Sequence, residues 1–129
     1  MGYRFLIVDD SATMRALIKR TLTLTGLPID AISESDNGRS AMVTLIGGQF
    51  DLVFIDLNMP ELSGTEMVAR MRANPKLANV PVMIVSSEAM DWRVEELKQA
   101  GVQGYVKKPF TPEQLRDAVN LILEIADAA

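Results

Sequence analysis

Short apolar runs alternate along this chain with longer stretches in which apolar residues recur at helical spacing. The runs predict strands over residues 4–8, 29–33, 52–55, 82–85 and 104–107. The stretches between them predict helices that end near Gly26, Gly47, Asn74 and Gly101, with a last one reaching about residue 126. Strands that alternate with helices in this way indicate βα units and a parallel sheet.

Cap and turn residues set the limits of these elements. Residues 63–66 and 111–114 both read as capping boxes that open a helix, and Pro81 can only begin the strand that follows it. The runs 52–55 and 82–85 are apolar throughout, as expected of strands covered on both faces, whereas the weaker run 29–33 is predicted at an edge.

The predicted fold is therefore α/β: a doubly wound, five-stranded parallel sheet in the order 2-1-3-4-5, a flavodoxin-like (βα)5 sandwich. With 129 residues the chain is the size of one domain. We expect residues 1–129 to form a single domain with no output domain.

Polar residues follow several of the predicted strands. Asp9 and Asp10 follow the first, Asp56 the third, Ser86 the fourth, and Lys108 the fifth. In the predicted order the first and third strands are neighbours, so the three acids should meet at the carboxyl edge of the sheet, where open α/β folds build their sites.

Composition removes several function classes. The formal net charge is −4 with no basic run, so direct nucleic-acid binding is not expected. The chain has no cysteine and no histidine, which excludes thiol and imidazole chemistry, and any phosphohistidine must belong to a partner. No signal peptide or membrane span is visible, and we expect a cytoplasmic protein without membrane insertion.

Three carboxylates brought together repel one another, and a hard divalent cation relieves the repulsion. Carboxylate ligands without His or Cys favour Mg²⁺ as the cofactor. Taken alone, Asp9 and Asp10 are equally well interpreted as the N-cap region of the next helix. Asp56 is different, because an acid after a buried strand needs a compensating charge.

Lys108 and Ser86 would each be ordinary surface residues if considered singly. Together with Mg²⁺ and the acids they make a set that can transfer a phosphoryl group, because the cations neutralise charge on the transferred oxygens. Asp56 is the predicted nucleophile and the product an aspartyl phosphate.

Four stretches carry a family resemblance: residues 8–15 (VDDSATMR), 56–60 (DLNMP) with Gly64, 85–89 (VSSEA), and 104–110 (GYVKKPF). In this order and spacing they resemble bacterial response-regulator receiver domains of two-component systems, especially the stand-alone chemotaxis CheY type. The resemblance covers essentially the whole chain.

The resemblance implies that a sensor histidine kinase or phosphotransfer protein phosphorylates Asp56. Mg²⁺ would be held by Asp9, Asp10, Asp56 and the backbone carbonyl of Asn58. Lys108, rather than its neighbour Lys107, would pair with the phosphoryl group, and the Lys108–Pro109 peptide would be cis. Activity would be limited to self-catalysed phosphoryl transfer and autodephosphorylation.

The resemblance also implies a switch made of Ser86 and Tyr105. Phosphorylation would draw Ser86 inward, let Tyr105 turn in, and remodel the face of the fourth helix, last strand and last helix, which contacts a downstream protein. Asn58 and Glu88 would tune the phosphoryl lifetime. We expect a monomer or weak dimer.

The output pathway stays open at this stage. Met90 and Trp92 are equally well interpreted as a partner anchor or as core residues. Leu57 and Ser87 differ from residues common in chemotaxis proteins of this type, so motility is one possible output among others.

Two other functions use a related fold. A phosphatase of the haloacid dehalogenase type needs an acid two residues after its nucleophile, where this chain has Asn58. A flavodoxin would bind the FMN phosphate after the first strand, where this chain has two carboxylates, Asp9 and Asp10. Both are disfavoured.

Overall fold

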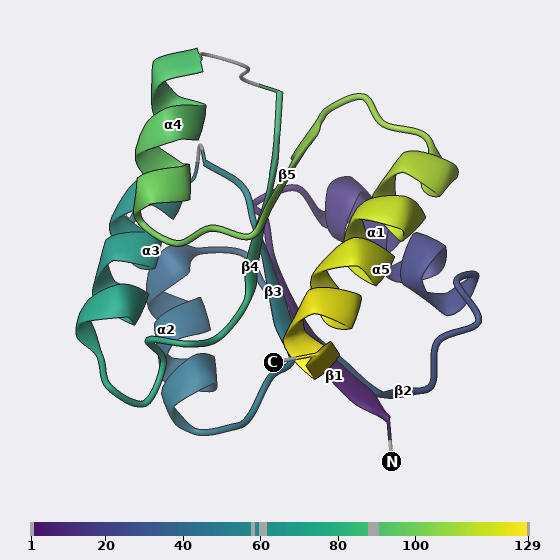
Figure 1. The fold of residues 1–129 in the computed structure, drawn as a ribbon, viewed down its shortest axis with the longest axis horizontal. Helices are drawn as coiled ribbons and strands as arrows, with labels where there is room; N and C mark the ends of the chain where they lie inside the picture. The colour runs from purple at the N-terminus through teal and green to yellow at the C-terminus, as the bar shows by residue number, and fades with distance from the viewer. Residues whose placement is uncertain (1, 58, 60–61, 88–90, 129) are drawn as a thin grey trace.

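The computed structural model describes residues 2–57, 59, 62–87 and 91–128. Within these residues strands and helices alternate along the chain (Figure 1). The strands are β1 Tyr3–Val8, β2 Ile29–Ser35, β3 Leu52–Ile55, β4 Val82–Ser86 and β5 Gly104–Lys107. The helices are α1 Ala12–Thr23, α2 Gly38–Ile46, α3 Gly64–Ala73, α4 Asp91–Gln99 and α5 Pro112–Ala128.

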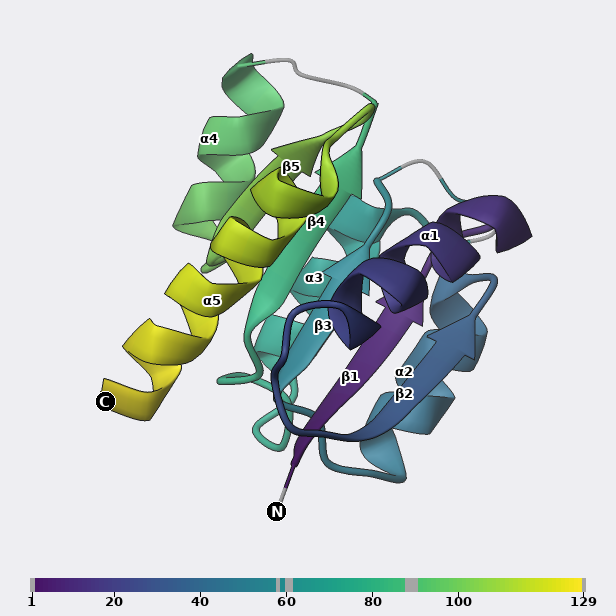
Figure 2. The same ribbon diagram turned by 90° about the vertical axis from the view of Figure 1, so that its right-hand side faces the viewer.

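The five strands form one parallel sheet in the order β2-β1-β3-β4-β5, which confirms the predicted order. Helices α2, α3 and α4 cover one face of the sheet, and α1 and α5 cover the other (Figure 1). Turned by 90°, the molecule shows α1 and α5 in front of the twisted sheet (Figure 2). The doubly wound sandwich is therefore confirmed.

The sheet divides the core into two apolar layers. Along β1, Leu6 and Val8 belong to the cluster that also contains Ala41, Met67 and Leu97, while Phe5 and Ile7 belong to the other. That second cluster holds buried apolar side chains of α1 and α5: Ile18, Leu22, Leu115, Val119, Ile122 and Leu123. Since successive residues of a strand point to opposite faces, a central strand must be apolar throughout to serve both layers.

The ends of the elements follow the predicted signals with small corrections. The strand predicted over 29–33 continues to Ser35, because Glu34 and Ser35 pair with Ile7 and Val8 of β1. β2 lies at an edge, as predicted. At the start of α5, Gln114 N donates to Thr111 Oγ1 at 3.1 Å and Thr111 N donates to Gln114 Oε1 at 2.9 Å, the reciprocal bonds of a capping box.

Arg72 on α3 connects the two loops that lead into β4 and β5. Its half-buried guanidinium donates to backbone carbonyls of the α3–β4 connection and of the turn after α4: Leu77, Ala78, Val80, Ala100 and Gly101. Burial lowers the pKa of Arg72. The end of α4 nearest β5 is thereby tied to α3 by several charge-assisted hydrogen bonds.

Within the described residues no helix combines the length and the apolar character needed to cross a lipid bilayer.

Gly64, the first residue of α3, lies against the backbone that carries Asp56. A Cβ added at Gly64 would come within 2.5 Å of the Asp56 carbonyl oxygen and 2.8 Å of Leu57 Cα. Because backbone cannot move aside as a side-chain end can, we predict that Gly64→Ala lowers the free energy of unfolding by about 1–3 kcal/mol or more. Urea denaturation followed by circular dichroism measures this change.

Gly47→Ala is the matched control for this prediction. A Cβ at Gly47 would find its nearest atom 3.5 Å away, and the backbone φ of −86° suits any residue. Its stability should stay the same or rise by up to about 1 kcal/mol. Equal unfolding midpoints for the two variants would contradict the steric explanation.

Candidate functional site

The carboxyl edge of the sheet brings three acids together. Asp9 and Asp10 follow β1 and Asp56 follows β3, and one carboxylate oxygen of each lies within 4.8 Å of the others. Asp9 and Asp56 are buried, at 1% and 7% exposure, whereas Asp10 is exposed. The cluster has the ligand chemistry of a hard divalent cation, and the exposure of Asp10 leaves such an ion open to water.

The backbone holds the two buried acids by continuing the sheet beyond the strands. Asp9 N donates to Ser35 O of β2 at 3.1 Å, and Asp56 N donates to Val8 O of β1 at 3.0 Å. Since β1 and β3 are neighbours, their first residues beyond the ladder are placed side by side. The predicted convergence of the acids therefore follows from the strand order.

Lys108 reaches these acids from the residue just after β5. Its Nζ lies 2.9 Å from Asp9 Oδ2 and 3.7 Å from Asp56 Oδ2. Its backbone N donates to Ser86 O at 2.8 Å, and the peptide between Lys108 and Pro109 is cis. Lys107, in contrast, is exposed, so the structure places Lys108 against the acids.

The capping interpretation of the acid pair is wrong. The N-cap of α1 is Ser11, whose Oγ accepts from Met14 N at 3.2 Å. Asp9 instead uses Oδ1 to accept from Ser11 N at 2.9 Å and Oδ2 to accept from Lys108. A serine at this position was the available sequence signal, because serine is a strong N-cap residue.

Ser86 and Tyr105 lie on neighbouring strands next to this edge. Ser86 ends β4 and is fully buried, while Tyr105 pairs with Ile84 in the β4–β5 register. The Tyr105 ring is partly buried against the core layer of α2 to α4, and its hydroxyl oxygen is buried. Beside it a hollow of about 310 Å³ is lined by residues of α4, of β5 and of the turn between them: Leu97, Lys98, Val102, Gln103, Gly104 and Tyr105.

Several predicted residues lie outside the part of the chain that the structure describes. Asn58, Glu88 and Met90 fall in the gaps, and the side chain of Trp92 is also outside the description.

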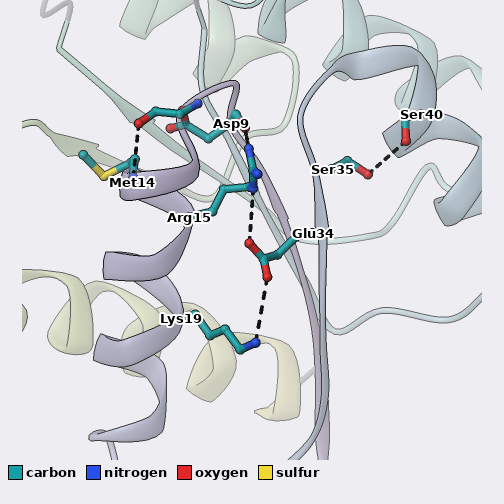
Figure 3. Close-up of polar contacts among 8 residues, drawn as sticks. Asp9, Met14, Arg15, Lys19, Glu34, Ser35 and Ser40 are labelled. Atoms are coloured by element: carbon teal, nitrogen blue, oxygen red, sulfur yellow. Dashed lines mark hydrogen bonds and ion pairs between the residues drawn. The ribbon is translucent and has the colours of Figure 1, made fainter.

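Sequence reasoning missed a set of charged contacts behind the acids. Arg15 Nη1 donates to the Asp9 carbonyl oxygen at 2.7 Å, and Arg15 Nε donates to Glu34 Oε1 at 3.2 Å. Figure 3 shows Arg15 of α1 between Asp9 and Glu34, with Lys19 reaching the other oxygen of Glu34. The available signal was a basic residue in the first turn of a helix, where the helix dipole disfavours it.

Comparison with known proteins identifies the family. The family model described as response regulator receiver domain matches residues 5–120. The chain belongs to this family. It is therefore a phosphorylation-dependent response regulator of the two-component type.

Individual relatives agree with this membership. The chain is 40% identical to a chemotaxis protein CheY of Pseudomonas aeruginosa, over 94% of this chain and 96% of that protein. The solved structure of CheY4 of Vibrio cholerae superposes with a TM-score of 0.86 at 28% identity, covering 95% of this chain and all of that one. A receiver domain of a histidine kinase from Syntrophus aciditrophicus gives 0.85 at 26% identity, covering 99% and 95%.

Lys108 should stabilise the metal-free protein, because its ammonium contacts both buried acids. Replacing it in Lys108→Met leaves the Asp9 and Asp56 carboxylates near each other without that charge. We predict a loss of about 1–3 kcal/mol in the free energy of unfolding in the presence of EDTA.

Lys107→Met is the control, since Lys107 is exposed. It should change stability by no more than about 0.5 kcal/mol. If urea denaturation gives the same stability for both variants, Lys108 does not balance the acids.

Proposed function

We propose that this chain is a signalling switch that accepts a phosphoryl group on Asp56. One observation carries the proposal: the buried Asp56 carboxylate lies within 3.7 Å of Lys108 and within the cluster formed with Asp9 and Asp10. A nucleophilic carboxylate, a cation and a set of metal ligands are thereby combined at one edge of the sheet. These are the parts that phosphoryl transfer to an aspartate requires.

The acid cluster fits Mg²⁺ as the cofactor. Asp9, Asp10 and Asp56 supply hard oxygen ligands, and the carbonyl of Asn58, which lies outside the described residues, is the further ligand that we propose. Mg²⁺ commonly binds through one or two carboxylates, phosphate oxygens and several waters. When bound, the ion would neutralise charge on the acids and on the phosphoryl oxygens.

In the proposed transfer, an Asp56 carboxylate oxygen attacks the phosphorus of a phosphohistidine on a kinase or phosphotransfer protein. The phosphorus–nitrogen bond breaks, its electron pair returns to the imidazole of the partner, and that nitrogen takes a proton from water. An ionised carboxylate has no proton to lose, so transfer needs no general base. This agrees with a chain that contains no histidine.

Lys108 is the proposed cationic partner of the phosphoryl group. It contacts Asp9 and Asp56 before transfer, and a short movement of its flexible side chain would bring the ammonium to the new phosphoryl oxygens. Phosphorylation removes the negative charge of the Asp56 carboxylate but adds the negative charge of the phosphoryl group. Lys108 would therefore have an anionic partner in both states.

Ser86 and Tyr105 are the proposed readout. Ser86 is buried at the tip of β4, the strand beside β3, from where its hydroxyl could bond a phosphoryl oxygen on Asp56. The Tyr105 hydroxyl is buried in this structure, so the switch would be a shift in population between this inward arrangement and an outward one. The face of α4, β5 and α5 would report that shift to a downstream protein.

The proposed setting is a cytoplasmic two-component system with a sensor histidine kinase or phosphotransfer protein upstream. The relatives named as chemotaxis proteins make a motility pathway the favoured output. The receiver family is a phosphoacceptor family, and we propose no turnover of small substrates beyond phosphorylation and autodephosphorylation of Asp56.

Intact-mass measurement after incubation with acetyl phosphate tests this function. In Mg²⁺ the native protein should gain the mass of one phosphoryl group, and EDTA should prevent the gain. Asp56→Asn should gain nothing, because the nucleophilic oxygen is replaced by an amide.

Asp36→Asn is the matched control. Asp36 is an exposed acid just after β2, at the same edge of the sheet, and its replacement should leave the mass gain unchanged. An unchanged native mass in Mg²⁺, with binding of the ion verified by calorimetry, would refute the proposed function. Continuous release of phosphate from simple esters would instead support the phosphatase alternative.

A further inference from the structure

Arg15 occupies a position that the helix itself does not favour. It lies in the first turn of α1, where the positive end of the helix dipole disfavours a cation. Its side chain is nevertheless largely buried, at 17% exposure, although arginine is seldom buried without partners. The partners of Arg15 must therefore account for its place.

Those partners are the backbone of Asp9 and the carboxylate of Glu34. Arg15 Nη1 donates to the Asp9 carbonyl oxygen at 2.7 Å, and Nε donates to Glu34 Oε1 at 3.2 Å. Lys19, one turn further along α1, lies 3.8 Å from the other Glu34 oxygen (Figure 3). The planar guanidinium is thus fixed at two points, which a lysine ammonium cannot reproduce.

The Asp9 carbonyl lies beyond the last β1–β2 pair, and a side chain, that of Arg15, donates to it. The β1–β2 register ends at Val8 and Ser35, and Asp9 adds a single bond beyond it, from its N to Ser35 O. The Asp9 carbonyl belongs to the peptide unit that joins Asp9 to Asp10. Holding this oxygen fixes the plane of that peptide, and hence the direction in which Asp10 leaves it.

We infer that Arg15 is a positioning residue that orients Asp10 for divalent-cation binding, and that Glu34 holds Arg15 in this role. The inference rests on the proposed cation site. Asp10 is the exposed member of the acid cluster. Its backbone is held on one side by the bond from Arg15 to the Asp9 carbonyl and on the other by the bond from Ser11 N to Asp9 Oδ1. Glu34 also offsets the positive charge of Arg15, which by itself would oppose binding of a cation.

The direction in which Mg²⁺ affinity changes when Arg15 is removed distinguishes positioning from a purely electrostatic effect. If Arg15 acted only through its charge, removing it would tighten Mg²⁺ binding, because one repelling cation would be gone. If Arg15 positions Asp10, removing it must weaken Mg²⁺ binding, as the loss of groups that orient metal ligands usually does.

The experiment is a Mg²⁺ titration of the full chain without phosphate donor, followed by amide shifts in ¹⁵N-edited NMR spectra. For Arg15→Gln we expect affinity to fall about tenfold or more, within the range known for residues behind metal ligands. Arg15→Lys keeps the charge and one donor and should lose less. Glu34→Gln should also weaken binding, and the double variant Arg15→Gln/Glu34→Gln should be no weaker than Arg15→Gln alone.

Arg20→Gln is the matched control, because Arg20 is exposed in the last turn of the same helix. It should keep the native affinity, and unfolding in EDTA shows whether each variant still folds. Unchanged or tighter Mg²⁺ binding in folded Arg15→Gln would overturn the inference. The titration measures Mg²⁺ affinity alone and needs no phosphorylation. A native protein that binds Mg²⁺ but takes up no phosphoryl group would contradict the proposed function, and the titration would still test the role of Arg15.

Discussion

The structure depends on one electrostatic constraint: the strand order places three carboxylates within 4.8 Å of one another. Asp9 and Asp56 are each the first residue beyond their strands. Because β1 and β3 are neighbours, the two acids lie side by side. Like charges at this distance repel strongly where water is excluded. Lys108 offsets part of this repulsion in the protein alone, and in the proposed function the remainder would favour binding of a further cation.

The same lysine links the charge balance to the neighbouring strands. Lys108 contacts the acids through Nζ, while its backbone N donates to Ser86 O at the tip of β4. A change of charge at Asp56 therefore acts on a residue that is bonded to the proposed readout residue Ser86. Tyr105, three residues before Lys108, lines the hollow beside α4. The Arg72 bonds to the turn after α4 hold that end of the helix to α3.

Much of this arrangement could be predicted from the sequence because it follows from local patterns. The fully apolar runs of β3 and β4 predicted central strands, and the polar residues after them predicted the edge where the acids meet. Of the two interpretations of Asp9 and Asp10, as metal ligands or as a helix cap, the cap was wrong, since Ser11 performs that function. The contact of Arg15 with Glu34 could not be found in this way, because it joins residues 19 positions apart on α1 and β2 and leaves no short motif.

Chemical mapping of the phosphorylated residue tests the central claim most directly. Borohydride reduces an aspartyl phosphate to homoserine, which marks its position permanently in a peptide digest. After treatment with acetyl phosphate and Mg²⁺, homoserine should replace aspartate at position 56 and should be absent from EDTA-treated protein. Homoserine at position 9 or 10, or a phosphate that resists borohydride on a serine or threonine, would contradict the account.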